Sequence, residues 1–360
     1  MKSRKGLAVA AFLLLLAILV FANRGRIHFD WSAFVVQLRG ISWLHIAGAI
    51  ALIYSTYALR AQRWAVFIAA TGRVSPVQLV GPQFIGFTAV ALFGRLADLT
   101  RPYLVARKVD LPVASQVAVY TIERMFDLGA AAIIFSGALL FAPSDLPHHE
   151  VFVRTGLVSL AGTALLAVFA VVVRVAGGAV AAAARAILGR FSPNLGNSVA
   201  EKILGFRSGL DAIHSATDFL LTALLSLAMW GLIGEAYVQT LHAFVSTPQL
   251  AALSYSRTML LMGASIGGSL LQLPIIGWFT QIAVTAAAMH TFYDAPIEAA
   301  TACGALLLLV TFLSIIPAGL LFARIDRISL KGAATQSQAT AEPKPGDAPP
   351  PAPQALPPTS

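Results

Sequence analysis

The sequence has few of the residues on which soluble proteins and disulfide-bonded scaffolds depend. Only 11% of its 360 residues are charged, and Cys303 is its one cysteine. A single cysteine within an apolar run excludes an intramolecular disulfide framework and a cysteine-based metal site. The low charge, together with a mean hydropathy of +0.78, excludes a soluble core with a polar surface.

The usual signatures of soluble enzymes are also missing. The sequence contains no Gly-rich nucleotide loop, no HExxH metal motif and no elbow for a catalytic serine. His148 and His149 are adjacent, and neighbouring side chains point apart on most backbones. We therefore expect no catalytic residue of these kinds, no metal and no cofactor.

What the sequence does contain is a series of long apolar runs. Such runs approach the roughly 20 residues that cross a bilayer, and lipid accepts only helices or closed barrels. The composition predicts an all-α polytopic membrane protein with about six full spans. The expected spans are 7–21, 43–59, 113–141, 153–173, 219–245 and 297–322. The first lacks a convincing cleavage site and is interpreted as a retained helix rather than a signal peptide.

Two further apolar stretches, 77–93 and 250–289, are interrupted by glycine and proline, including Gly81, Pro82 and Pro274. We interpret them as re-entrant helical hairpins that enter from opposite faces of the membrane. Paired interrupted helices of this kind are typical of inverted repeats in transporters. Ordinary kinked spans are the alternative, because glycine and proline are common in membrane helices.

The positions of the cations predict the topology. With both hairpins re-entrant, about 19 of the 25 Lys and Arg fall on one side, as the positive-inside rule requires. We therefore expect a bacterial-type inner (plasma) membrane protein with both termini in the cytoplasm.

The chain divides into regions of different composition. Residues 1–42 are expected to form the first transmembrane helix and an external loop, and 43–323 the main membrane domain. Within that domain, 174–215 is predicted to be a cytoplasmic loop that contains an amphipathic helix, which either lies on the anionic leaflet or serves as a solvated connector helix. Residues 324–360, rich in Pro and Ala, are predicted to be a disordered cytoplasmic tail.

Charged residues concentrate in two places within this apolar chain. "LFGRLADLTRPYLVARK" contains Arg95, Asp98 and Arg101, and "LRAQRW" contains Arg60 and Arg63. Guanidinium groups bind phosphate in a bidentate way, so these residues are suited to holding a lipid headgroup. The alternative is a positive-inside loop that only fixes the topology.

The next expected span carries Glu123, Arg124 and Asp127 in an otherwise apolar run. Glu123 and Asp127 are four residues apart and lie on one face of a helix. Charges within a span are costly and usually face a partner or a cavity. We expect a charge network with the arginines, which either contributes to substrate binding or serves only to lock helices together.

Another acid, Glu235, lies deep in the span 219–245, with Gln239 and His242 on the same helix face. An intramembrane acid is a candidate functional residue. The alternative is a carboxyl that is hydrogen-bonded to a neighbouring helix and has a structural role.

Several motifs resemble those of a known family in order and spacing. "LRAQRW", "TGRVSPVQL", "IGF", "GRLADLTRPYLVAR" and "ERMFDL" are similar to motifs of the lysylphosphatidylglycerol synthase/flippase transmembrane family, flippase-like membrane proteins that include hopanoid-associated members. The resemblance covers 43–322 and is more specific in the first half. It implies a polytopic membrane fold that moves lipids between leaflets.

The sequence departs from the family pattern at defined positions. Asp98 stands where glutamate is usual, and Ala97 replaces glycine. In "LPIIGWFTQIA", Pro274 and Gly277 match the second-half turn of the family, but Gln281 occupies the position usually held by glutamate. The resemblance implies a groove at these residues, although a proton-coupled step through that position would lack its carboxylate.

The residues and the resemblance together predict a flippase-like transporter that moves an anionic phospholipid, or another lipid with a phosphate or polar head. The partners expected are membrane lipids and lipid-biosynthesis proteins, and not nucleic acid. No aminoacyl-transferase domain is recognised, so transport is favoured over synthesis. The alternatives are a non-transporting enzyme or accessory subunit in lipid, hopanoid or polyprenol-linked sugar biosynthesis, and a solute transporter with a closed midplane site.

Overall fold

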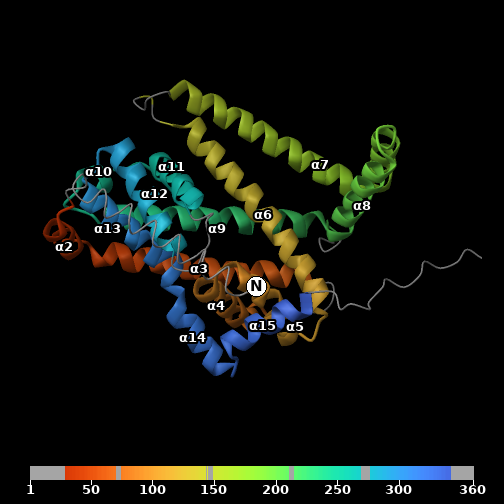
Figure 1. The fold of residues 1–360 in the computed structure, drawn as a ribbon, viewed down its shortest axis with the longest axis horizontal. Helices are drawn as coiled ribbons and strands as arrows, with labels where there is room; N and C mark the ends of the chain where they lie inside the picture. The colour runs from red at the N-terminus through yellow and green to blue at the C-terminus, as the bar shows by residue number, and fades with distance from the viewer. Residues whose placement is uncertain are drawn as a thin grey trace, which may run out of the picture.

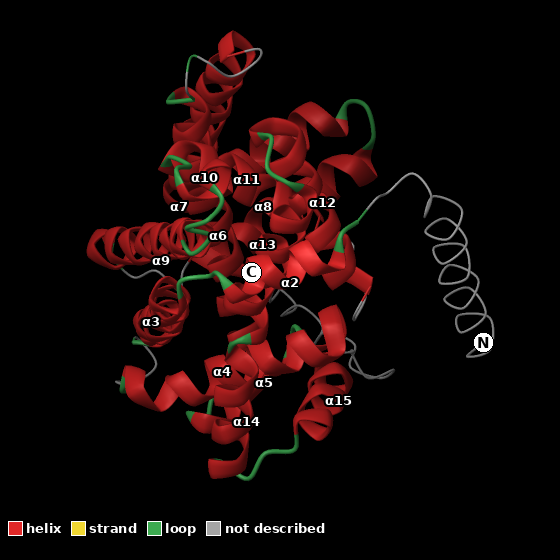
Figure 2. Cartoon of the chain, turned by 90° about the vertical axis from the view of Figure 1, so that its left-hand side faces the viewer, coloured by secondary structure: helices red, strands yellow, loops and turns green. Residues whose placement is uncertain are grey.

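The computed structural model describes residues 29–69, 74–142, 144, 149–210, 215–268 and 276–341. All regular structure within these ranges is helical (Figures 1 and 2), so the all-α prediction is confirmed. The predicted first span, 7–21, lies outside the described residues, as do Pro274 and the last part of the tail.

The helices follow one another with short connections. In chain order they are α2 (Trp31–Arg39), α3 (Trp43–Ile68), α4 (Pro76–Phe93), η1 (Gly94–Ala97), α5 (Thr100–Lys108), α6 (Val113–Leu140), α7 (His149–Gly189), α8 (Pro193–Leu210), α9 (Ala216–His242), α10 (Pro248–Ala251), α11 (Tyr255–Gly268), α12 (Ile276–Tyr293), α13 (Ile297–Leu308), η2 (Leu309–Leu313), α14 (Ile315–Ile325) and α15 (Leu330–Ala341).

Five helical segments of the described chain are long and apolar enough to cross a membrane: α3, α4, α7, α9 and the continuous segment Ile297–Ile325. Helix α6 has 28 residues, but Glu123, Arg124 and Asp127 lie within it. These lengths suit a bilayer core of about 30 Å, and the polytopic membrane class is confirmed.

The prediction of a hairpin within 77–93 is wrong, and the helical hairpin of this region is formed by α4 and α5. We expected Gly81, Pro82 and Gly86 to break 77–93, whereas α4 runs through all three. The chain turns after α4, at Gly94, whose φ of 71° favours glycine, and α5 packs back against α4. The Arg-rich stretch, interpreted as a polar connection, therefore forms the second leg of the hairpin and is largely buried.

The close approach of α5 to α4 depends on Gly86. A Cβ atom at this position would lie 2.6 Å from the Cβ of Arg101. We expect Gly86→Val to push α5 away from α4 and to cost about 1–3 kcal/mol of stability, as overpacking of a buried contact does. Thermal unfolding of purified protein in detergent should show a lower Tm.

Gly48→Val on α3 is the matched control, because a Cβ atom there would meet nothing within 4 Å. Its Tm should stay close to that of the wild type. Equal melting temperatures for the two variants would contradict the tight α4–α5 contact.

The second hairpin consists of α11 and α12, which pack against each other. A Cβ atom at Gly268 would approach Val284 Cβ to 2.9 Å, so glycine allows this packing as well. Gly263 lies inside α11 without breaking it. The order long helix, hairpin, long helix thus occurs twice, as α3–α4–α5–α6 and as α9–α11–α12–α13, with α3 packed along α9 (Figure 1).

Two regions differ in extent from the sequence-based expectation. Helix α7 continues past a kink at Ala176 to Gly189, beyond the predicted span end at 173, and it packs against α8, which falls where an amphipathic helix was expected. The tail, predicted to be disordered from 324 on, begins with the end of α14 and with α15. Ala333 and Ala334 of α15 are buried in small apolar clusters with Leu104 and Ala97, which explains why this part of the tail is ordered.

Candidate functional site

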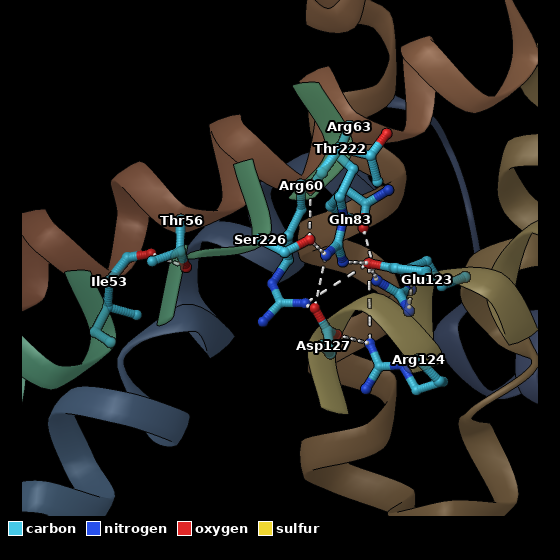
Figure 3. Close-up of polar contacts among 11 residues, drawn as sticks. Ile53, Thr56, Arg60, Arg63, Gln83, Glu123, Arg124, Asp127, Thr222 and Ser226 are labelled. Atoms are coloured by element: carbon cyan, nitrogen blue, oxygen red, sulfur yellow. Dashed lines mark hydrogen bonds and ion pairs between the residues drawn. The ribbon is translucent and has the colours of Figure 1, made fainter. Parts of the chain in front are cut away.

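A group of charged side chains lies where α3, α4, α5, α6 and α9 meet (Figure 3), and we call it the arginine cluster. Its members are Arg60, Arg63, Arg101, Arg124, Glu123 and Asp127.

Glu123 is the shared anion of the arginine cluster. Arg63 Nη2 lies 2.6 Å from Glu123 Oε1. Arg101 binds the same carboxylate in a bidentate way, since Nη1 lies 2.9 Å from Oε1 and Nη2 lies 2.7 Å from Oε2. Arg101 Nη1 also donates to Gln83 Oε1 at 3.1 Å. Two cations therefore fix one fully buried acid, which ties α3, α5 and α6 together and joins them to α4.

Asp127 is the second anion and lies one helical turn further along α6. Arg63 Nη1 lies 2.7 Å from Asp127 Oδ1 and donates to Ser226 Oγ on α9 at 2.6 Å. Arg124 Nη2 lies 3.1 Å from Asp127 Oδ2, whereas Arg60 Nη1 is 3.5 Å away from that oxygen. Both Nη atoms of Arg63 are thus engaged by acids, whereas Arg60 is only loosely held.

Aromatic rings of α3 and α4 lie against the cations of the cluster. The guanidinium carbon of Arg101 lies 5.0 Å from the centre of the Trp64 ring and 4.7 Å from that of Phe87. Arg60 lies 4.9 Å from the Phe87 ring. These contacts partly replace hydration and keep water away from the ion pairs, which strengthens their electrostatic interaction.

The arginine cluster carries more positive than negative charge. Four arginines face two carboxylates, at distances of 2.6 to 3.9 Å. Asp98 lies beside Arg101 and Arg124, where they line a small cavity of about 30 Å³, and counting it still leaves one positive charge in excess. The side chain of Arg95 in η1 lies outside the described residues. Uncompensated buried charge is costly, so the cluster is suited to receiving an anion.

A larger cavity of about 270 Å³ opens next to Arg60, between the two hairpins. The described residues that line it come from α3, α4, η1, α9, α11, α12 and η2, and Arg60 is the one charged side chain among them. Trp230 of α9 also lines this cavity. In the described part of the chain, Arg60 Nε, Arg60 Nη1 and Trp230 Nε1 are buried donors without a hydrogen-bond partner. Donors of this kind mark a place where a ligand acceptor fits.

Residues of the second half complete the wall of this cavity. Gly277 and Gln281 of α12 line it, and Gln281 Nε2 donates to Ser265 Oγ at 3.1 Å. Thr311 and Phe312 belong to the π-helical turn η2, an irregularity that is frequent at functional sites. The structure therefore brings predicted residues of both halves, Arg60 from the first and Gly277 and Gln281 from the second, to one cavity.

Glu235 belongs to a different polar group. Its Oε1 accepts from Gln239 Nε2 at 2.7 Å, and Gln239 Oε1 lies 2.7 Å from His45 Nδ1 on α3. The expected partner His242 instead lies 3.3 Å from the carbonyl oxygen of Leu253. Glu235 therefore contributes to packing between α9 and α3, and it does not line the cavity at Arg60.

Sequence reasoning missed three side chains of the site. Gln83 and Ser226 each bind an arginine of the cluster, and Trp230 lines the cavity and has a buried N–H without a hydrogen-bond partner. Gln83 carried a usable signal, because a glutamine in an apolar run needs partners. Ser226 and Trp230 carried none, since serine and tryptophan are ordinary residues of membrane helices.

Comparison with protein families gives one match, the lysylphosphatidylglycerol synthase TM region, over residues 6–321. Comparisons with curated proteins and with solved structures found no match. The matched region includes both hairpins, the arginine cluster and the cavity at Arg60, and it agrees with the resemblance seen in the motifs. The chain belongs to the lysylphosphatidylglycerol synthase transmembrane-region family.

Proposed function

We propose that this protein is a flippase-like transporter that binds the anionic, phosphate-bearing headgroup of a membrane lipid at Arg60 and moves it between leaflets. The observation that carries the proposal is the cavity between the hairpins. It combines an incompletely paired guanidinium with a free indole N–H, next to a cluster with excess positive charge.

The arginines of the cluster have different roles in this proposal. Arg63 and Arg101 are bound by Glu123, and they position the cluster rather than meet the lipid. Arg60 has only long contacts of 3.5 and 3.7 Å to the acids, so its donors can turn to a phosphate. A guanidinium is well suited to this exchange, because its planar fork matches phosphate oxygens and it stays charged when buried.

The size of the cavity supports a headgroup rather than a whole lipid. Drug-sized ligands occupy about 300–1,000 Å³, so 270 Å³ fits a phosphate with a small substituent while the acyl chains remain in the membrane. Residues of both hairpins line the cavity, and rocking one hairpin against the other would open it to alternate leaflets.

Features of the acids favour transport over the enzymatic alternative. A general base must reach the proton that it removes. Glu123 and Asp127 are held by arginines, and Asp98 borders a cavity of about 30 Å³, which has room for about one water molecule. None of these acids has access to a substrate of headgroup size in this arrangement.

The test is leaflet exchange in liposomes. Wild-type protein is reconstituted with fluorescent phosphatidylglycerol or phosphatidylcholine, and exchange is followed by dithionite quenching. We expect faster exchange of the anionic lipid, and a roughly tenfold lower rate for Arg60→Gln, because a hydrogen bond to a charged group contributes about 1.5–3 kcal/mol.

Arg324→Gln is the matched control, because Arg324 is an exposed arginine on α14 outside the cavity. It should exchange lipid at the wild-type rate. No exchange by well-inserted wild-type protein, or equal rates for the two variants, would count against the proposal and favour an accessory role in lipid synthesis.

A further inference from the structure

A second polar cavity lies away from the arginine cluster, between α5 and the corner that joins α14 to α15. These three helices lie near one another in Figure 2. Its volume is about 390 Å³. Side chains of Tyr103, Arg107 and Lys108 line it from α5, and Arg327, Ser329 and Gln336 line it from the other side. We call it the corner groove. By the predicted topology it faces the cytoplasm.

The corner groove is rich in positive charge. Lys108 Nζ lies 2.9 Å from Asp326 Oδ1, so this cation has its partner. Arg107 and Arg327 are exposed, and no salt bridge joins either to a carboxylate of the described residues. The first turn of α15 also borders the groove and adds the partial positive charge of a helix N-terminus. Two guanidinium groups therefore face a groove in which the one described carboxylate, that of Asp326, is paired with Lys108.

The backbone at Arg327 is a second, independent observation. Arg327 has a φ of 54°, a left-handed conformation that favours glycine. Ile328 N donates to Ala323 O at 2.8 Å and Arg327 N to Arg324 O at 3.2 Å, the hydrogen bonds of a Schellman helix end. Glycine would serve this turn better, so an arginine here indicates a role for the side chain.

Other polar groups shape the far wall of the corner groove. Tyr103 Oη donates to Gln336 Oε1 at 2.7 Å and so links α5 to α15 across it. Ser329 Oγ accepts from the backbone N–H of Gly332 at 3.3 Å, which leaves its own hydroxyl proton free to donate. The groove thus offers guanidinium and hydroxyl donors around one space.

We propose that the corner groove is a second anion site, which binds a phosphate group through Arg107 and Arg327. Both a lipid headgroup of the adjacent leaflet and a soluble phosphate ester present this chemistry, and the volume accepts either. The site is distinct from the cavity at Arg60, since the two share no lining residue. The inference does not depend on lipid transport.

The test measures binding to full-length protein in neutral detergent, in an Arg60→Gln background that weakens the other cavity. The probes are short-chain dihexanoyl phosphatidylglycerol and glycerol 3-phosphate, titrated by thermophoresis. Removal of both guanidinium groups in Arg107→Gln/Arg327→Gln should weaken binding about 25-fold, at about fivefold for each cation near a membrane surface. Arg324→Gln/Lys331→Gln removes two exposed cations outside the lining and should change binding less than twofold.

The two probes distinguish the source of the phosphate. Similar affinities for both would identify a phosphate site that a soluble ester can fill. Binding of the lipid probe alone would identify a headgroup site. The proposal would be overturned if neither probe bound, or if the two double variants lost binding affinity equally.

The variant Arg327→Gly removes the side chain and leaves the backbone turn intact, so it tests the role of the side chain alone. Glycine relieves the left-handed backbone, so the Tm should stay equal or rise, while binding should weaken about fivefold. Wild-type affinity in this variant would overturn the role assigned to Arg327.

Discussion

Replacing Glu123 by glutamine is expected to destabilise the protein by about 3–5 kcal/mol, because removal of one partner leaves buried charges uncompensated. Glu123 is 1% exposed and receives Arg63 and Arg101, which are themselves almost fully buried. A neutral amide would leave these guanidinium groups without their shared anion. Purified Glu123→Gln should show a much lower Tm in detergent and faster proteolysis near Lys108, where α5 ends.

Glu235→Gln is the matched control, since Glu235 is also an acid within a long apolar helix. Its carboxylate accepts from the neutral Gln239 side chain, so a glutamine there loses little. We expect a Tm close to that of the wild type. Should Glu123→Gln melt at the same temperature as this control, the ion pairs would not hold α5 in place.

The membership of the arginine cluster could be predicted from sequence, because charges in apolar helices must find partners. Arg60, Arg63 and Arg101 were expected to meet Glu123 and Asp127, and they do. Their different roles could not be predicted. Whether an arginine grips Glu123 or faces a cavity depends on the packing of α3 against α9, and no spacing within one helix encodes that.

The break in the first hairpin was misplaced for a physical reason. Proline lacks an N–H and usually interrupts a helix, so Pro82 was expected to end one. In α4 it is buried against other helices and the helix continues, which membrane helices tolerate when neighbours satisfy the freed groups. The chain instead turns at Gly94, which has a positive φ, and the one sequence feature that marks this turn is a single glycine.

The order of the first part of the tail was equally hard to predict. Leu330–Ala341 is polar and rich in alanine, which suggests little capacity to form a core. Alanine is a strong helix former, and two of its small side chains fit where α4, α5 and η1 approach closely. Contacts with α4, α5 and η1 therefore supply the apolar burial that the local sequence lacks.

Gln281→Glu is expected to slow exchange of an anionic lipid about a hundredfold at neutral pH. Gln281 and Arg60 line the same cavity, so a carboxylate at this position would neutralise the guanidinium and occupy the donors that the phosphate needs. Displacing such a charge-assisted contact costs about 2–3 kcal/mol, which corresponds to this change in rate. The variant is informative because the resemblance to the family implies a glutamate at this position.

The pH dependence of lipid exchange by Gln281→Glu distinguishes the effect of the added charge from the effect of the changed side-chain shape. Acidification that protonates the new carboxylate removes its negative charge and frees Arg60, so exchange should recover as the pH falls, whereas the wild-type rate should change little. Gln281→Met, which removes the hydrogen bond to Ser265 without adding charge, should slow exchange far less than Gln281→Glu. Equal slowing in both variants would mean that the amide hydrogen bond matters and the charge at Arg60 does not. Recovery only in Gln281→Glu would identify Arg60 as the cation that the lipid phosphate must reach.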